Sequence, residues 1–398
     1  MHLIAKTCFT GFRVNLIHSK YLSCMQLTSR RDKLSSTISP QAFSCLTSNK
    51  IKVGQYRPTS HQVHLKVKSL PNVTIGKKEL LVQNGWKDNQ MDLMKWPLVY
   101  ASLSKWYLTW FVVMTADAGY CLAPVPFEQS TFLLVTLGTA LCSCSANTLN
   151  QIAEVPYDAQ MDRTRNRPLV KGIISPLHAF LFAVVTGSTG VACLYQGVNG
   201  LTAALGFTNL ALYAGVYTAL KRKHWFNTWV GAVVGSIPPL MGWTAATGSL
   251  DSGAMIFAGI LYAWQFPHFY ALAWRRRGDY ARGSYHMLPL SHPTATKYVV
   301  LFHTGLLWSL CLAAPVTGVT TLWFVAMSTP INLWLSYKSY RFHRETNSNS
   351  ALQLYKCSLY YLLLISLALV VDRKVLSKML TKDNNNDFSL LPVKESIL

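Results

Sequence analysis

Apolar and polar residues follow one another in long blocks along most of this chain. From Pro97 onward, apolar stretches of about 20 residues are separated by short polar segments. A helix of that length spans the hydrocarbon layer of a membrane, because each residue adds about 1.5 Å to the helix and the layer is about 30 Å thick. Nine transmembrane helices are predicted on this basis, at residues 100–123, 131–153, 176–195, 200–220, 228–247, 253–274, 297–317, 320–338 and 354–371. The predicted fold class is all-α, a polytopic membrane protein with its helices in a bundle.

The sequence before the first apolar stretch has a different character. Residues 1–96 hold 15 Lys and Arg, only four acids and many Ser and Thr. A basic, acid-poor, Ser-rich leader is typical of a mitochondrial transit peptide, and a disordered basic cytosolic tail is the alternative. We therefore predict a transit peptide at 1–60, a polar N-terminal matrix segment at 61–96, a membrane domain at 97–372 and a polar tail at 373–398.

The composition agrees with a membrane protein and excludes several other classes. Hydrophobic residues make up 51% and charged residues 13% of the chain, which leaves too little charge to cover a water-exposed surface. This balance excludes a disordered chain, a collagen-like chain and a disulfide-dense secreted module. The nine cysteines form no CxxC pair, so neither a zinc site nor a disulfide framework is predicted.

The basic residues are placed asymmetrically between the predicted loops. The loops after helices 2, 4, 6 and 8 hold 16 Lys and Arg together, whereas the loops after helices 1, 3, 5 and 7 hold none. In a nine-helix chain, the N-terminus and the even-numbered loops share one side, which the positive-inside bias places in the mitochondrial matrix. The net charge of +21 thus reflects topology and an anionic ligand on one face, and nucleic acid is not expected as a partner.

Acidic residues are rare in the membrane domain, and three polar residues line up at the end of the second predicted helix. Asn150, Glu154 and Asp158 are spaced by four and lie on one helical face; Asp162 follows four residues later, although Pro156 is expected to bend the axis. The basic residues directly after them are Arg163, Arg165, Arg167 and Lys171. Mg²⁺ prefers such oxygen ligands, and Arg forms paired hydrogen bonds with phosphate oxygens. The pattern predicts a diphosphate site; an interfacial salt-bridge cluster is the alternative.

A second polar group ends the sixth predicted helix. His268 lies inside an apolar run, and ionisable residues within a membrane are functional candidates, although a bond to a neighbouring helix is the alternative. Several aromatic residues of this helix are candidates to line a pocket, although aromatic residues at helical spacing more often pack in the core: Trp264, Phe266, Phe269 and Trp274.

Asp279, Tyr280 and Arg282 follow on the same predicted side as the acidic cluster. This shared side follows from the helix parity. Asp279 is expected to supply a second metal ligand or a charge partner; pairing with Arg275 or Arg276 is the alternative.

Three motifs resemble those of one enzyme family. Residues 150–158 resemble the NxxxDxxxD motif of the UbiA-type intramembrane prenyltransferases, with Glu154 in place of the middle Asp. MDRTRNRPLVKG resembles the MxRTxxRPLxxG block of the protoheme IX farnesyltransferase branch, and WQFPHF and DYARGSYHMLP match its second block. The resemblance covers about residues 97–371.

The resemblance implies a bundle of nine helices around a lipid-open central cavity. Farnesyl diphosphate would bind through Mg²⁺ held by Asn150, Glu154 and Asp158, with Asp279 in the second motif. The catalytic residues would be Asp158, Arg163, Arg167, Lys171 and His268. Substrate contacts would come from Arg163, Arg167, Lys171, His268, Tyr280 and Arg282.

The implied reaction joins farnesyl C1 to a vinyl group of heme b, followed by hydration to heme O. Heme b is then a substrate and not a cofactor, and a downstream heme A synthase is an expected partner beside the lipid bilayer. The implied location is the mitochondrial inner membrane, with the site on the matrix side. Two rivals are a prenyltransferase for an aromatic acid of quinone synthesis and a metal-gated carrier or channel.

Overall fold

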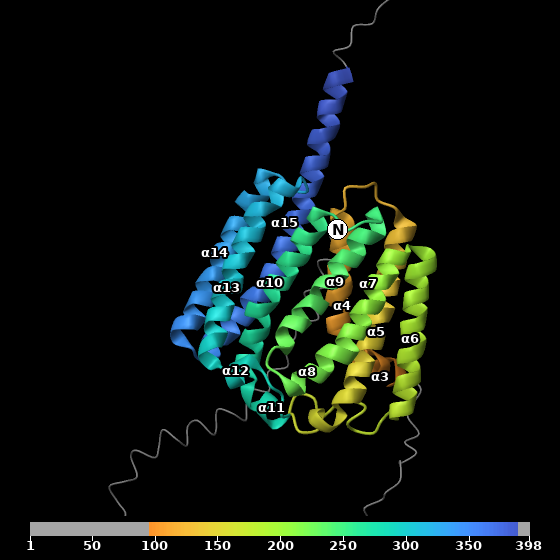
Figure 1. The fold of residues 1–398 in the computed structure, drawn as a ribbon, viewed down its shortest axis with the longest axis vertical. Coiled ribbons are helices and arrows are strands. Elements are labelled where there is room, and N and C mark those ends of the chain that lie inside the picture. The colour runs from red at the N-terminus through yellow and green to blue at the C-terminus, as the bar shows by residue number, and fades with distance from the viewer. Residues whose placement is uncertain (1–94, 389–398) are drawn as a thin grey trace, which may run out of the picture. The chain divides into compact units, whose positions relative to one another are not determined.

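The computed structural model describes residues 95–388, with side chains described up to residue 373. The predicted transit peptide, all but the last two residues of segment 61–96, and the side chains of the tail beyond residue 373 lie outside the described residues. Between residues 95 and 388 the chain forms helices and no strands (Figure 1). The all-α prediction is therefore confirmed for this range.

Long apolar helices make up the bundle. They are α4 (Trp106–Leu122), α5 (Gln129–Asp158), α6 (Pro176–Gly197), α7 (Gly200–Ala211), α9 (Asn227–Thr247), α10 (Ser252–Arg275), α13 (Pro293–Ala313), α14 (Leu322–Glu345) and α15 (Ser348–Phe388). Short elements join or precede them: α3 (Trp96–Leu103), η3 (Leu212–Tyr217), α8 (Thr218–Lys223), α11 (Arg277–Arg282), α12 (Leu288–Ser291) and η4 (Ala314–Thr317). The π-helix η3 continues α7 directly into α8.

Every apolar stretch predicted from the sequence coincides with one helix or with consecutive helical elements. Among the described residues, five helical segments are long and apolar enough to cross a membrane: Gln129–Asp158, Pro176–Gly197, Gly200–Lys223, Pro293–Thr317 and Ser348–Arg373. The count of nine crossings stays a prediction. The first predicted span differs in one respect, because it is broken between α3 and α4 at residues 104 and 105.

Small residues allow close packing where α4 crosses α9. A Cβ atom added at Gly119 would lie 2.1 Å from the carbonyl oxygen of Pro239, and one at Gly242 would lie 1.8 Å from that of Ala116. Only glycine permits this approach, which is common between membrane helices. The crossing brings α9 against α4, and both helices line the cavity described below.

The largest apolar core lies among α9, α10, α13, α14 and α15. Its fully buried aromatic side chains include Phe266, Phe324, Phe342 and Tyr361. This half of the bundle supports α10, which carries the second sequence motif.

The polar connections meet at one end of the bundle. Figure 1 shows α3, α8, α11 and α12 at the same end, beside the segment that joins α5 to α6. The helix parity predicted this arrangement, since the loops after the second, fourth and sixth helices had to share a side. The two sequence motifs are thus brought to one face, whose orientation toward the matrix stays a prediction.

Candidate active site

The end of α5 carries a buried polar face. The helix continues through Pro156 to Asp158, so Asn150, Glu154 and Asp158 share one side, with residue exposures of 0%, 6% and 1%. The Asn150 amide nitrogen donates to Glu154 Oε1 at 2.9 Å and to Thr218 Oγ1 at 2.8 Å. The spacing of four residues predicted this alignment, and it is confirmed.

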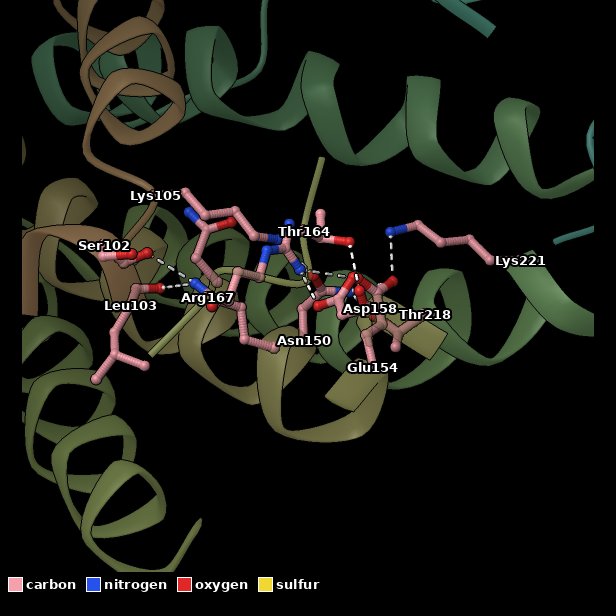
Figure 2. Close-up of polar contacts among 12 residues, drawn as sticks. Ser102, Leu103, Lys105, Asn150, Glu154, Asp158, Thr164, Arg167, Thr218 and Lys221 are labelled. Atoms are coloured by element: carbon pink, nitrogen blue, oxygen red, sulfur yellow. Dashed lines mark hydrogen bonds and ion pairs between the residues drawn. The ribbon is translucent and has the colours of Figure 1, made fainter. Parts of the chain in front are cut away.

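Three cations surround these oxygens, as Figure 2 shows. Lys221 Nζ donates to Glu154 Oε1 at 2.8 Å. Arg167 pairs with Asp158 Oδ2 and lies 3.6 Å from Glu154 Oε2. Lys105 Nζ donates to the amide oxygen of Asn150. These six residues, Lys105, Asn150, Glu154, Asp158, Arg167 and Lys221, are called the buried cluster below, and its three cations outnumber its two carboxylates.

Lys105 reaches the cluster because the helix is broken there. Its backbone has φ of +47°, a left-handed conformation that a non-glycine residue rarely adopts, and α4 begins at the next residue. The break frees carbonyl groups of α3, and α5 supplies the donors: Gln151 Nε2 donates to the carbonyls of Ser102 and Leu103, each at 2.8 Å. These bonds fix the position of Lys105 beside Asn150.

The π-helix η3 places two tyrosines next to the cluster. Single π-helical turns within α-helices are often found at functional sites. The Tyr213 hydroxyl accepts from Lys105 Nζ at 3.2 Å and donates to the Asn147 amide oxygen at 3.1 Å. The Tyr217 ring lies under Lys221, with 4.4 Å between Nζ and the ring centroid. Both lysines are thus held by tyrosines as well as by the polar face of α5.

An apolar cavity of about 160 Å³ adjoins the cluster. Side chains from α4, α5, α7, η3, α9 and α10 line it, among them Leu108, Ala146, Tyr217, Val234, Met241 and Phe269. Asn147 and Tyr213 line the cavity, and the Tyr213 hydroxyl also accepts from Lys105 Nζ of the buried cluster. The site therefore joins a charged end to an apolar end, a combination suited to a ligand with an anionic head and a hydrocarbon chain.

The donor set of α5 fits a hard divalent cation. Asp158 Oδ1 is buried and has no hydrogen-bond partner among the described residues, so one carboxylate oxygen remains available. The other oxygens come from Glu154 and the Asn150 amide. In the described part of the chain, no group of three His, Cys, Asp or Glu side chains lies close enough to hold a metal. A cation here would complete its shell with phosphate oxygens and water, as Mg²⁺ usually does.

A second group of charges lies in the two loops beside the cluster. Arg282 pairs with Asp279 and, at 2.6 Å, with Asp162, whose backbone N–H donates to Asp279 Oδ1 at 3.2 Å. Arg165 lies 3.4 Å from Asp162. These four residues, the loop clip, join the segment after α5 to α11. Among the described residues, Asp279 makes no hydrogen bond or ion pair with Asn150, Glu154 or Asp158. Its cation partner is Arg282, and not Arg275 or Arg276, which were the alternative considered from the sequence.

The remaining predicted residues lie apart from the buried cluster. Arg163 and Lys171 are exposed and make no side-chain hydrogen bond or ion pair within the described range. Tyr280 is half-buried, and its ring lies 6.1 Å from that of Tyr285. Their contacts with a substrate stay predictions.

His268 faces another helix. Its Nδ1 lies 2.9 Å from Ser358 Oγ on α15, and its ring stacks on Trp264 with centroids 4.7 Å apart. The neighbours Gln265 and Phe269 line the cavity, whereas His268 is not among its lining residues. The geometry matches the alternative considered above, a histidine bonded to a neighbouring helix, and a heme contact stays a prediction.

Sequence reasoning missed Lys105, Lys221, Tyr213 and Tyr217 as site residues. The sequence held one signal for Lys105. It is one of only two charged residues in the first apolar stretch, and the other is Asp117. A lysine inside a membrane helix is a functional candidate by default. The tyrosines gave no such signal, because the π-helical turn that presents them is not visible in the sequence.

Comparison with known proteins identifies the class of this chain. Residues 110–365 match the UbiA prenyltransferase family, and the chain belongs to that family. Within it, the chain is similar to proteins named protoheme IX farnesyltransferase, mitochondrial. It is 50% identical over 297 residues to the one from Homo sapiens, covering 75% of this chain and 67% of that protein. It is 39% identical over 275 residues to the one from Saccharomyces cerevisiae, covering 69% and 60%. The resemblance drawn from the three sequence motifs is confirmed.

Solved structures support the fold. A digeranylgeranylglyceryl phosphate synthase superposes with a TM-score of 0.61 at 15% identity, covering 70% of this chain and 98% of that chain. A UbiA homolog from Archaeoglobus fulgidus, bound to GPP and Mg²⁺, gives 0.51 at 12% identity, covering 69% and 99%. At these identities, the likeness shows the shared fold alone.

Proposed function

We propose that this protein transfers the farnesyl group of farnesyl diphosphate to a vinyl group of protoheme IX, with addition of water, to give heme O and diphosphate. The observation that carries the proposal is the buried cluster, joined through Tyr213 to an apolar cavity, a combination that fits a diphosphate head and an isoprenoid chain. The 50% identity to the human protoheme IX farnesyltransferase supports heme as the acceptor.

The proposed chemistry begins at the charged end. Asn150, Glu154 and Asp158 would hold Mg²⁺, which supplies positive charge against the diphosphate. Arg167 and Lys221 now pair with the carboxylates, and they exchange part of that pairing for phosphate oxygens when the substrate binds. Lys105 adds a third cation from the opposite side of Asn150. These fixed charges stabilise the leaving group as the C1–O bond breaks.

The carbon chemistry follows in the apolar part. When the C1–O bond breaks, its electron pair leaves with the diphosphate and an allylic cation remains. The π electrons of the heme vinyl group form the new bond to C1, which moves the positive charge to the vinyl carbon next to the pyrrole. Water adds there and loses a proton, leaving a hydroxyl group. The apolar wall around Tyr217 and Phe269 limits water near the first cation.

The location follows from the loops and the relatives. We propose that the cluster faces the matrix from the mitochondrial inner membrane, because the basic loops gather at that end and the named relatives are mitochondrial. The product would then pass to the next enzyme of heme A synthesis. Tags at residues 222 and 342 are expected on the matrix side, and one at 198 on the opposite side. Access to residue 222 only from the intermembrane space would contradict this orientation.

The direct test uses purified full-length protein. Incubation with heme b, farnesyl diphosphate and Mg²⁺ should give a product with the mass of heme O, and EDTA should stop its formation. A parallel reaction replaces heme b by 4-hydroxybenzoate, the acceptor of the rival aromatic prenyltransferases. Farnesylation of that acid without any heme product would overturn the proposal.

A further inference from the structure

Tyr285 lies on the segment between α11 and α12, and sequence reasoning assigned it no role. Its side chain is buried, with 5% exposed, and its hydroxyl has no hydrogen-bond partner among the described residues. Buried polar atoms are nearly always hydrogen-bonded, so an exception calls for an explanation. A hydroxyl that is held ready for a substrate atom gives one.

The ring of Tyr285 is fixed by its neighbours. It packs with Met161 and Met287 in a small apolar cluster, and its centroid lies 6.2 Å from that of Tyr157. Tyr157 belongs to the last turn of α5, one residue before Asp158. The packing therefore holds the phenol beside the end of the helix that carries the acidic face.

The backbone around Tyr285 is anchored to α8. Ser284 has φ of +54°, a strained left-handed conformation, and it turns the chain just before Tyr285. The next residue, His286, donates its N–H to the Lys221 carbonyl at 2.8 Å. Its own carbonyl accepts from Asn227 Nδ2 at 2.6 Å. The segment is thus tied to the same lysine that donates to Glu154.

The charges of the buried cluster act on the Tyr285 phenol. Burial raises the pKa of Tyr285 far above its ordinary value; the Glu154 and Asp158 carboxylates raise it further, and Lys221 and Arg167 oppose them. The phenol is therefore protonated at neutral pH and acts as a hydrogen-bond donor. A donor surrounded by these four charges suits an anionic oxygen.

We propose that the Tyr285 hydroxyl donates a hydrogen bond to the diphosphate of the prenyl substrate and stabilises the charge that this group gains as the C1–O bond breaks. This inference rests on the proposed function of the same site. It assigns a phosphate contact to Tyr285, whereas the resemblance suggested Tyr280, five residues earlier, as a substrate contact.

The test compares Tyr285→Phe with Tyr270→Phe in the full chain. Tyr270 is a buried tyrosine of the apolar core, where its ring packs on Phe266, so its variant controls for removal of a buried hydroxyl. Tyr285→Phe should lower kcat/KM for farnesyl diphosphate by about ten- to a hundredfold, the range for a hydrogen bond to a charged group. Inorganic diphosphate with Mg²⁺ should inhibit it more weakly by a similar factor, while heme affinity and the thermal midpoint stay unchanged. Wild-type kinetics in this variant would overturn the inference.

A second measurement does not depend on how that variant folds. With 3-fluorotyrosine at position 285, the ¹⁹F resonance should shift when inorganic diphosphate and Mg²⁺ are added, and the same label at position 270 should not respond. An unchanged resonance at 285 would also overturn the inference. If diphosphate shifts the resonance of the protein labelled at position 285, but the wild type does not farnesylate heme, the proposed acceptor is wrong and the role of Tyr285 stands.

Discussion

The buried cluster and the loop clip lie at the same end of the bundle and use the same residue types, but they differ in exposure. In the buried cluster, the side chains of Glu154, Asp158, Arg167 and Lys221 are between 1% and 16% exposed. In the loop clip, Arg282 is 52% and Asp162 62% exposed, and Asp279 alone is buried, at 8%. An ion pair between an Arg and a carboxylate therefore has different energetic consequences in the two clusters. Water screens the exposed pairs of the loop clip and is largely excluded from the buried cluster.

We propose that this difference in exposure separates the acidic residues that act in the reaction from those that hold two loops together. Removing one partner of a buried pair leaves an uncompensated charge, whereas exposed pairs contribute about 0–1 kcal/mol. A protein retains such a buried set of charges where an anion and a cation must bind. The clip instead joins two loops, and Asp279 bridges them by accepting from the Asp162 backbone as well as from Arg282. We infer that Asp279 positions the loop that carries Tyr285.

A substitution of Asp158 is expected to have the largest effect on activity. Asp158→Ala should lower heme farnesylation at least about a hundredfold while the protein stays inserted, because it removes the carboxylate that pairs with Arg167 and that we propose as a metal ligand. Asp162→Ala, four residues further along the chain, is the matched control and should retain activity within about threefold. Equal loss in both variants, measured by product mass, would show that the two clusters act as one site.

Arg167 and Arg165 lie two residues apart in one loop, so they allow the buried cluster and the loop clip to be compared directly. Arg167→Ala should raise the KM for farnesyl diphosphate by an amount equivalent to about 1.5–3 kcal/mol, the range for a hydrogen bond to a charged group. Arg165→Ala serves as the control, since that side chain is 62% exposed and pairs only with Asp162 in the described structure. Steady-state kinetics in which Arg165→Ala is the more damaging change would reverse the assignment.

His268 separates a packing role from a substrate role outside both clusters. Its bond to Ser358 is worth about 1 kcal/mol, so His268→Ala and Ser358→Ala should each lower stability and show a coupling of that size in a double-mutant cycle. Diphosphate affinity should be unchanged in both. Loss of heme affinity in His268→Ala alone, measured by heme titration, would favour the role suggested by the sequence motif.

Most of the fold and half of the site could be predicted from the sequence. The period of four residues aligned Asn150, Glu154 and Asp158, and the following basic run contained Arg167. These features are local, so helical geometry is enough to place them. The parity of the loops also brought the two motifs to one end.

The rest depended on local irregularity and on contacts between distant segments. Lys105 enters the site through a left-handed residue at a helix break, and Tyr213 through a π-helical turn. Neither the helix break nor the π-helical turn produces a repeating pattern of residues in the sequence. Asp279 pairs with Arg282 and not with Arg275 or Arg276, because α10 ends at Arg275 and the short helix α11 places residues 279 and 282 one turn apart. A new helix start of this kind was not visible in the basic run.

The smallest expected effect concerns the clip itself. Arg282→Ala should lower stability by about 1 kcal/mol, because the guanidinium is half exposed and water screens its pair with exposed Asp162 fully and its pair with buried Asp279 in part. High salt should reduce the difference from wild type, since exposed pairs weaken as ionic strength rises. The KM for farnesyl diphosphate should change less than in Arg167→Ala, because Arg282 contacts no member of the buried cluster in the described residues. Thermal unfolding at two salt concentrations, together with that KM, checks both points. A KM change as large as that of Arg167→Ala would place Arg282 on the substrate, as the sequence motif suggested, and would extend the diphosphate site into the clip.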